Sequence, residues 1–362
     1  MEEQQTTSKL ATDNKTPKTR KYKKMVSYSK YGYLFLIPFF VVFVIFQLIP
    51  LIQTFYYSFF EYYNQQLTTV GPNFIGFDNF ANLLVGTPEA PTMFWKYLGN
   101  TMIIWIIGFI PQIIVSLLLA IWFTDSRLKL KCSQFFKAIT YMPNLVMASA
   151  FGMMFLMMFG QNGPINQILI SLGILDSAYV FTNSAWWVRI IIAGINWLMW
   201  FGNTTILLMS GIMGIDESIF ESARLDGASA SRTFWQITMP LLMPIFVYVL
   251  ITSLIGGLQL FDAAQIFTES TGGPDASSYT IIMYLFSLVT NSHDYGMAGA
   301  VSVIIFIFTG VLSLVVFKTL VPNYKAAKAE AKSYRKRQRW LKDINNDSSS
   351  LTKGLEADGG TR

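Results

Sequence analysis

The chain has 362 residues, of which 52% are hydrophobic, 15% aromatic and only 13% charged. A water-soluble domain of this length would need far more charge on its surface, so the composition excludes an ordinary soluble protein. A single Cys and a single His exclude an internal disulfide framework and leave little for a thiolate or imidazole metal site. The net charge of +6 could indicate binding to nucleic acid, but the positions of the basic residues along the chain indicate another role.

Six apolar runs are long enough to cross a bilayer core of roughly 30 Å, which needs about 20 helical residues. A further apolar stretch, Thr280–Thr290, is too short to span and is expected at the interface or folded over the mouth of a pore. The first run follows a polar arm, is longer than a signal-peptide core and lacks a small-residue cleavage site, so we expect a retained helix. The predicted spans are 33–58, 98–123, 138–159, 187–212, 237–260 and 297–320.

The positions of Lys and Arg predict the orientation of the chain. The two terminal segments and the loops 124–137 and 213–236 hold 25 of the 27 basic residues, whereas the alternate loops hold only Lys96 and Arg189. Both termini are therefore predicted in the cytoplasm, in a multi-pass protein of the cell (inner or cytoplasmic) membrane. The loops 61–97, 160–186 and 261–296 are predicted to face outward.

Two polar, charge-rich segments flank the spans. Residues 1–30 form a basic cytoplasmic arm and residues 321–362 a basic cytoplasmic tail, and neither can bury enough apolar surface to fold alone. Basic segments beside a membrane usually lie against anionic lipid headgroups. The positive charge is therefore explained by topology and lipid, and no nucleic-acid partner is expected. Residues 31–320 are predicted to be one all-α transmembrane domain.

The cytoplasmic loop between spans four and five predicts a short amphipathic helix. Asp216 can cap the helix start, and Glu217 lies in the first turn, where the helix dipole favours negative charge. Apolar residues recur at helical spacing on one side, and Gly227 is a natural helix stop. Such a helix could insert into a groove of a partner protein or simply lie on the membrane surface.

The exact residues of this loop resemble the signature loop of binding-protein-dependent ABC importer permeases. That loop reads Glu-Ala-Ala, three residues, Gly and, after nine more residues, Ile-x-Leu-Pro. Ser222 replaces the first Ala and Met239 the Leu. The matching positions are Glu221, Ala223, Gly227, Ile237 and Pro240.

The resemblance extends from about Tyr31 to Leu320 and favours the carbohydrate branch, in particular the first-permease type of the maltose transporter. It implies two permease subunits that form the substrate path, two separate ATPase subunits that use ATP and Mg²⁺, and an extracytoplasmic sugar-binding protein. The segment 215–228 would be the coupling helix docked in an ATPase cleft. Matching phrases lie at 36–38, 74–80, 100–101, 141–143, 160–166 and 271–274.

The resemblance also implies roles for individual residues of the loop. Glu221 would make the polar contact to the ATPase, Gly227 allows the turn, and Ala223 lets the helix seat closely. The chain itself is not expected to be an enzyme or to bind a cofactor, because it has no Gly-x-x-x-x-Gly-Lys-Ser/Thr loop for phosphates. The ATPase-coupling candidates are Glu221, Ala223, Arg224, Asp226, Gly227 and Ala228.

A sugar path needs polar groups that match hydroxyls and aromatic faces on which a ring can stack. Span four and the outer end of span five supply both. An amide inside a membrane costs free energy unless it is paired, so an interhelical hydrogen bond is as good an explanation for the Asn residues as contact with sugar. Asp262 could equally face the binding protein. The path candidates are Asn196, Trp200, Asn203, Gln259 and Asp262.

Two alternatives remain open. An ABC permease for a polyol or a glycerol phosphate compound would carry the same signature loop. The small number of basic residues on the predicted outer face favours a neutral sugar, and the expected substrate is an oligosaccharide. An ion-coupled secondary carrier would need carboxylates at mid-membrane, and no Asp or Glu lies inside the six predicted spans.

Overall fold

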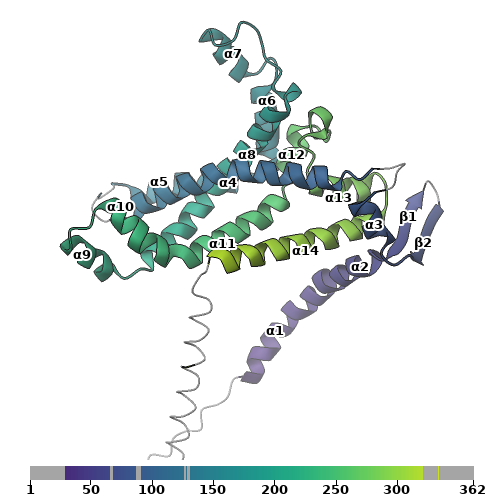
Figure 1. Cartoon of the computed structure of the whole chain (residues 1–362), viewed down its shortest axis with the longest axis horizontal. Helices are drawn as coiled ribbons and strands as arrows, with labels where there is room; N and C mark the ends of the chain where they lie inside the picture. The colour runs from purple at the N-terminus through teal and green to yellow at the C-terminus, as the bar shows by residue number, and fades with distance from the viewer. Residues whose placement is uncertain are drawn as a thin grey trace, which may run out of the picture. The chain divides into compact units, whose positions relative to one another are not determined.

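The structure is a computed structural model that describes residues 29–320 except 66–67, 87–90, 126–127 and 129–130, together with Ser333. The arm 1–30, apart from its last two residues, and nearly all of the tail 321–362 lie outside this description. Almost all described secondary structure is helical, as the composition predicts (Figure 1). The chain divides after Gln53 into two units, which are described separately.

The first unit is built on one apolar helix. α1 (Ser29–Phe43) continues through a π-helical turn, Val44–Leu48, into α2 (Ile49–Tyr57). Tyr31–Tyr57 is long and apolar enough to cross a membrane, which confirms the first predicted span. Every described side chain from residue 31 to residue 53 is exposed in the isolated chain, so this surface needs lipid or another protein to cover it.

The second unit is organised around long apolar helices, and the predicted spans two, four, five and six are confirmed. Pro111 and Pro244 lie inside two of these helices. Figure 1 shows the four running along one another. They are α4 (Phe94–Thr124), α8 (Ala185–Met213), α11 (Met239–Leu258) and α14 (Tyr295–Leu320).

The third predicted span, 138–159, is wrong as one continuous helix. α5 (Ser133–Tyr141) passes into a 3₁₀ turn, Met142–Leu145, and α6 (Ala148–Phe159) starts in a direction 88° away. Pro143 lies in this turn, and Val146 and Met147 have extended backbone angles that a helix cannot contain. The described chain thus has five helices able to span, or six if the bent pair α5–α7 crosses as one.

A β-hairpin at one end of the second unit was not predicted. β1 (Phe60–Gln65) and β2 (Thr68–Phe74) pair antiparallel, with Phe60 opposite Phe74. Backbone contacts from Tyr63 to Asp294 and from the Asn64 N–H to the His293 carbonyl tie the hairpin to the start of α14. We call this end of the unit the hairpin end and the opposite end, which carries α9 (Glu217–Leu225), the α9 end.

Short helices complete both ends. α13 is only ten residues long, which confirms that Thr280–Thr290 cannot span, and it contacts α4 and α14. At the α9 end, α10 and a π-helical turn, Phe234–Thr238, lead into α11. The remaining short helices are α3 (Asp78–Leu84), α7 (Pro164–Ser171), α10 (Ala230–Thr233), α12 (Asp262–Phe267) and α13 (Ile281–Thr290).

The core of the second unit is the close pair α4 and α8. A Cβ on Gly108 of α4 would lie 2.9 Å from the carbonyl oxygen of Ala193 on α8, so the missing side chain lets the two backbones approach. Ile104, Ile192 and Ile195 are fully buried around this crossing. The pair forms a rigid framework that joins the hairpin end to the α9 end.

Candidate functional site

The N-terminus of α9 has the cap that the sequence predicts. The Asp216 carboxylate accepts a hydrogen bond from the Ser218 N–H at 3.0 Å. This hydrogen bond lowers the pKa of Asp216 below its ordinary value. Glu217 follows in the first turn, so two negative charges lie at the positive end of the helix dipole. The predicted helix start is confirmed.

The C-terminus of α9 ends in a Schellman motif. Gly227 has φ of +73°, its N–H donates to the Arg224 carbonyl at 3.0 Å, and the Ala228 N–H donates to the Ala223 carbonyl at 2.9 Å. Only a residue without a Cβ adopts this backbone at little cost. The predicted stop at Gly227 is confirmed, and the predicted segment 215–228 contains the observed helix together with both caps.

The two faces of α9 differ in exposure. Ala223 is only 7% exposed and Phe220 is half-buried, so this face packs on the chain's own helices. That Ala223 lets the helix seat closely, as the resemblance implies, stays a prediction. The opposite face is open: Leu225 is 89% exposed, and Glu221 and Arg224 are exposed as well.

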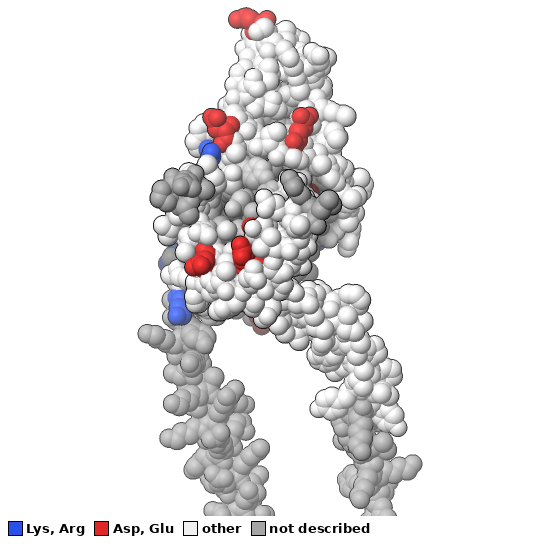
Figure 2. All heavy atoms as spheres, turned by 90° about the vertical axis from the view of Figure 1, so that its right-hand side faces the viewer, with Lys and Arg blue, Asp and Glu red and all other residues white. Residues whose placement is uncertain are grey.

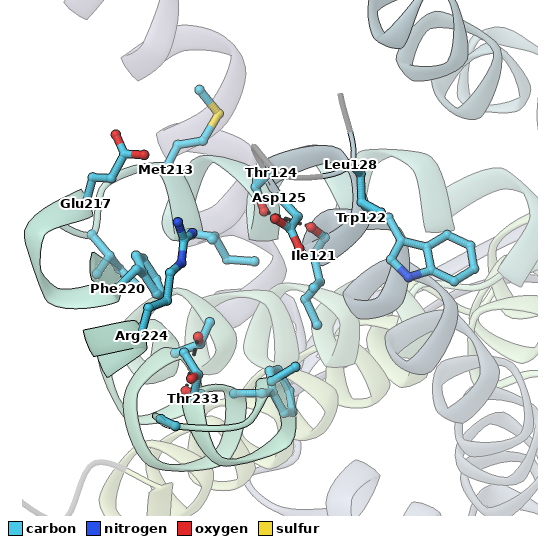
Figure 3. A pocket seen from close by; sticks show the side chains of 16 residues that line it. Ile121, Trp122, Thr124, Asp125, Leu128, Met213, Glu217, Phe220, Arg224 and Thr233 are labelled. Atoms are coloured by element: carbon cyan, nitrogen blue, oxygen red, sulfur yellow. Dashed lines mark hydrogen bonds between the residues drawn. The ribbon is translucent and has the colours of Figure 1, made fainter. Parts of the chain in front are cut away.

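A cavity of about 610 Å³ lies between α9 and the ends of α4 and α8 (Figure 3). Its walls are mostly apolar and aromatic, including Trp122, Phe220 and Phe234. Charged groups enter from different elements: Asp125 follows α4, whereas Glu217 and Arg224 belong to α9. Glu221 does not line this cavity. The remaining lining residues are Ile121, Thr124, Leu128, Ile212, Met213, Ile215, Ala228, Ala230, Thr233 and Thr238.

Three of the five path candidates form one stripe on α8. Asn196, Trp200 and Asn203 follow one another at four and three residues, which places them on one face of the helix. Trp200 is 44% exposed and both Asn residues are half-buried. Neither Asn side chain hydrogen-bonds to another described residue, so the stripe offers free amides and an aromatic face.

The polar group of α8 that joins helices lies elsewhere on its surface. Thr204 is buried, and its hydroxyl accepts a hydrogen bond from the Gln112 amide of α4 at 2.8 Å. An interhelical hydrogen bond was the alternative explanation for the Asn residues of this span. The structure shows such a bond at Thr204 instead. Thr204 and Gln112 stabilise the α4–α8 pair and are not available to a ligand.

The other two path candidates lie near the hairpin end and do not join the α8 stripe. Gln259 is exposed at the C-terminus of α11 and lines a separate cavity of about 460 Å³ between α11, α13 and α14. Asp262 is exposed at the first residue of α12. Asn196 does not line the cavity to which Gln259 belongs.

A clamp at the hairpin end was not found from sequence. Lys96 donates to the Asp275 carbonyl at 2.6 Å, and Arg189 donates to the Ser277 carbonyl at 2.9 Å and to the Asn100 side chain at 3.0 Å. Asn100 in turn donates to the Ala276 carbonyl at 2.9 Å. Both basic residues of the predicted outer face therefore hold the loop 275–277. On the face drawn in Figure 2, the Asp and Glu side chains lie apart from one another and do not form one acidic patch.

The described residues offer no metal centre. No three His, Cys, Asp or Glu side chains gather as ligands within the described ranges. The described residues present an open amphipathic helix at one end, a polar and aromatic stripe on a long helix, and a clamped loop at the other end.

Apolar helices long enough to span, joined by short connections and one capped amphipathic helix, define a multi-pass membrane protein. The family described as binding-protein-dependent transport system inner membrane component matches residues 112–324, which is more than half of the chain and includes α9. The chain belongs to this family of ABC importer permeases.

Individual relatives agree with this assignment. The lactose transport system permease protein LacF of Rhizobium radiobacter is 30% identical over 292 residues, which cover 80% of this chain and 94% of the relative. The arabinooligosaccharides transport system permease protein AraP of Bacillus subtilis is 29% identical, with 79% and 87% covered. A bacterial ABC transporter involved in the import of the acidic polysaccharide alginate has the same fold, with a TM-score of 0.65 at 20% identity, covering 82% of this chain and 96% of that one.

Proposed function

We propose that the chain is a permease subunit of an ATP-binding-cassette importer that moves a sugar, in particular an oligosaccharide, across the cell membrane. The observation that carries the proposal is α9, a doubly capped amphipathic helix with an open face, placed between two long helices of a family member. A second permease would complete the path, and an extracytoplasmic binding protein would deliver the sugar. ATP and Mg²⁺ would be used by two separate ATPase subunits.

In this proposal α9 is the coupling helix. Its open face would enter a cleft of the ATPase by the helix-in-groove mode, with Glu221 as the polar contact and Leu225 as an apolar one. Arg224 and Asp226 border this face, and Gly227 and Ala228 supply the C-terminal cap that keeps the helix short. Because α9 lies in the chain between α8 and the segment that leads into α11, movement of the ATPase would be transmitted to the spans.

The clamp at the hairpin end supports a substrate without phosphate. Lys96 and Arg189 are the two basic residues of the predicted outer face, and each donates to a backbone carbonyl of the loop 275–277, which leaves fewer of their N–H groups for an anion. The relatives named for lactose and arabinooligosaccharides point to carbohydrate as well. The stripe Asn196, Trp200 and Asn203, with Gln259 and Asp262 nearer the outer face, would line the path. A polyol or glycerol phosphate compound remains the alternative substrate.

The test uses the complex of this chain with its partner subunits, reconstituted in proteoliposomes. Glu221→Lys is expected to abolish sugar uptake and sugar-stimulated ATP hydrolysis, because it reverses the charge at the open face of α9. Glu217→Lys is the matched control: it makes the same charge change on the same helix at a position that lines the chain's own cavity. We expect it to retain the larger part of both activities.

Membrane insertion and pull-down of the ATPase separate a coupling defect from misfolding. Equal losses in the two variants would contradict a specific role for Glu221. Uptake by the chain without any ATPase subunit would overturn the proposal and favour an ion-coupled carrier. Competition with neutral oligosaccharides, polyols and glycerol phosphate compounds then identifies the substrate class.

A further inference from the structure

The cavity beside α9 is not lined by Glu221 or Leu225, the two proposed contacts with the ATPase. α4, α8, α9 and the segment 230–238 all contribute to it, so anything bound there would fix α9 relative to the long helices (Figure 3). Its volume of about 610 Å³ is in the range of pockets that bind a compact ligand or a few side chains. The apolar and aromatic lining suits an aromatic or aliphatic anchor.

Among the residues that line the cavity, negative charges outnumber positive ones by two to one. Asp125 and Glu217 line the cavity and Arg224 is the one basic residue among the sixteen lining residues. Arg224 could lie on the face of a bound aromatic ring, while the carboxylates favour flanking positive charge. The caps and the open face of α9 add further carboxylates, namely Asp216, Glu221 and Asp226. The cavity therefore fits an apolar anchor inside a basic sequence.

The tail of this chain contains such a sequence. Trp340 and Leu341 are adjacent, and five basic residues surround them: Arg335, Lys336, Arg337, Arg339 and Lys342. α14 leaves the hairpin end at Tyr295 and is packed along α11, whose preceding turn lines the cavity, so Leu320 ends on the cavity's side of the molecule. A random coil as long as the segment from Leu320 to Trp340 would have an end-to-end distance of roughly 25 Å, so the length of the segment lets the anchor reach this side of the molecule.

We propose that the cavity beside α9 is a binding site for the chain's own C-terminal tail, with Trp340 and Leu341 as the anchor. The tether makes this an intramolecular contact with an effective concentration of about millimolar, so even a weak contact is occupied. Because the bound tail would hold α9 against the long helices, it restrains the movement on which coupling depends. The assignment of this restraint to transport, though not the tail contact itself, rests on the proposed function.

A disulfide cross-link in the full complex tests the contact directly. In a Cys132→Ser background, which removes the single native thiol, Met213→Cys is combined with Leu341→Cys. Met213 lines the cavity and is 68% exposed, so the variant leaves the core intact. Trp235→Cys with Leu341→Cys is the control, because Trp235 is 65% exposed, close to the value for Met213, but does not line the cavity. We expect about tenfold more cross-link with Met213→Cys than with the control.

Lipid composition separates the pocket from the membrane surface. If the tail occupies the cavity, the cross-link persists in vesicles of pure phosphatidylcholine. If the tail lies on anionic headgroups, cross-linking is equal for the two pairs, and the tail thiol is protected from a soluble maleimide only when anionic lipid is present; this result overturns the proposal. Replacing Trp340 and Leu341 by Ser, with the thiol moved to Ile344→Cys, should remove the preference for Met213→Cys.

Truncation after Ser333 tests the restraint. We expect ATP hydrolysis without sugar to rise about two- to threefold, as loss of a weak intramolecular contact would produce. An unchanged rate in a complex that shows the specific cross-link would overturn the restraint. A specific cross-link in a chain that never supports ATP-driven uptake would instead remove the proposed function and leave the tail contact standing.

Discussion

At the residue scale, glycines decide how closely the helices of the second unit approach. Gly202 on α8 faces the backbone of α5, and a Cβ there would overlap the carbonyl oxygen of Thr140. Backbone cannot move aside as the end of a flexible side chain can. Gly194, two turns earlier on the same helix, has open space where its Cβ would be. The two glycines therefore separate a packing effect from the helix propensity of glycine itself.

Gly202→Ala is expected to destabilise the protein by about 1–3 kcal/mol, the usual cost of overpacking. Gly194→Ala is expected to be neutral or slightly stabilising, because Ala favours the helix more than Gly does. The midpoint of thermal aggregation, followed by size-exclusion chromatography of detergent-solubilised protein, measures the difference. Equal midpoints for the two variants would show that α5 can shift away from α8.

At the element scale, the β-hairpin and α14 share a partly buried carboxylate. The Asp294 side chain accepts a hydrogen bond from the Met297 N–H at 2.9 Å and so caps α14. Burial raises the pKa of Asp294, and the negative charge of Glu61 on β1 raises it further, against the lowering effect of the cap. The ionised form of Asp294 is therefore disfavoured where the hairpin packs on the helix.

A raised pKa in the folded state means that protonation of Asp294 stabilises the fold. This contribution is fully present below the ordinary pKa of 3.8 and is lost as the pH rises through the raised value. Asp294→Asn keeps an oxygen to accept the cap hydrogen bond but has no charge. The variant is expected to have a higher thermal midpoint than the native protein near pH 7, and the two midpoints should converge as the pH falls toward 4. A difference that does not vary with pH would show that Asp294 ionisation does not affect stability.

Local chemistry made some elements predictable and left others hidden. α9 could be predicted with both ends, because Asp216 and Gly227 act on their own neighbours in sequence. The break at Pro143 was hidden because the apolar run is continuous and a proline is often tolerated within a membrane helix. The hairpin 60–74 alternates only weakly, so the signal for strands was missed in what was predicted as a loop.

The candidate site shows a similar division. The proposed coupling residues all lie between Glu221 and Ala228, so a resemblance in one loop is enough to propose them. The clamp joins Lys96, Asn100 and Arg189 to a loop far away in sequence, and only the folded chain brings them together. The α8 stripe of Asn196, Trp200 and Asn203 follows from helical spacing, but its use requires surfaces that a second permease would add.

At the scale of the whole molecule, the division into two ends makes the orientation in the membrane testable. The long helices separate the hairpin end from the α9 end, so a probe that cannot cross the bilayer reaches only one of them in intact cells. Thr69 on β2 and Ser222 on α9 are both exposed, and Cys132→Ser provides a background without thiols. The distribution of Lys and Arg predicts that the hairpin end faces outward.

An impermeant maleimide is therefore expected to label Thr69→Cys in intact cells and to leave Ser222→Cys unlabelled. Permeabilised cells or inverted vesicles should expose Ser222→Cys, which shows that its thiol is reactive once the barrier is removed. Native Cys132, exposed before α5, serves as an internal reference, because it lies in the loop between spans two and three and should behave like Ser222→Cys. Labelling of Ser222→Cys but not Thr69→Cys in intact cells would invert the orientation and with it the side on which an ATPase could reach α9. Labelling of Ser222→Cys together with Thr69→Cys, with native Cys132 still protected, would instead mean that the bent pair α5–α7 does not cross the membrane as a span, because Cys132 and α9 would then lie on different sides.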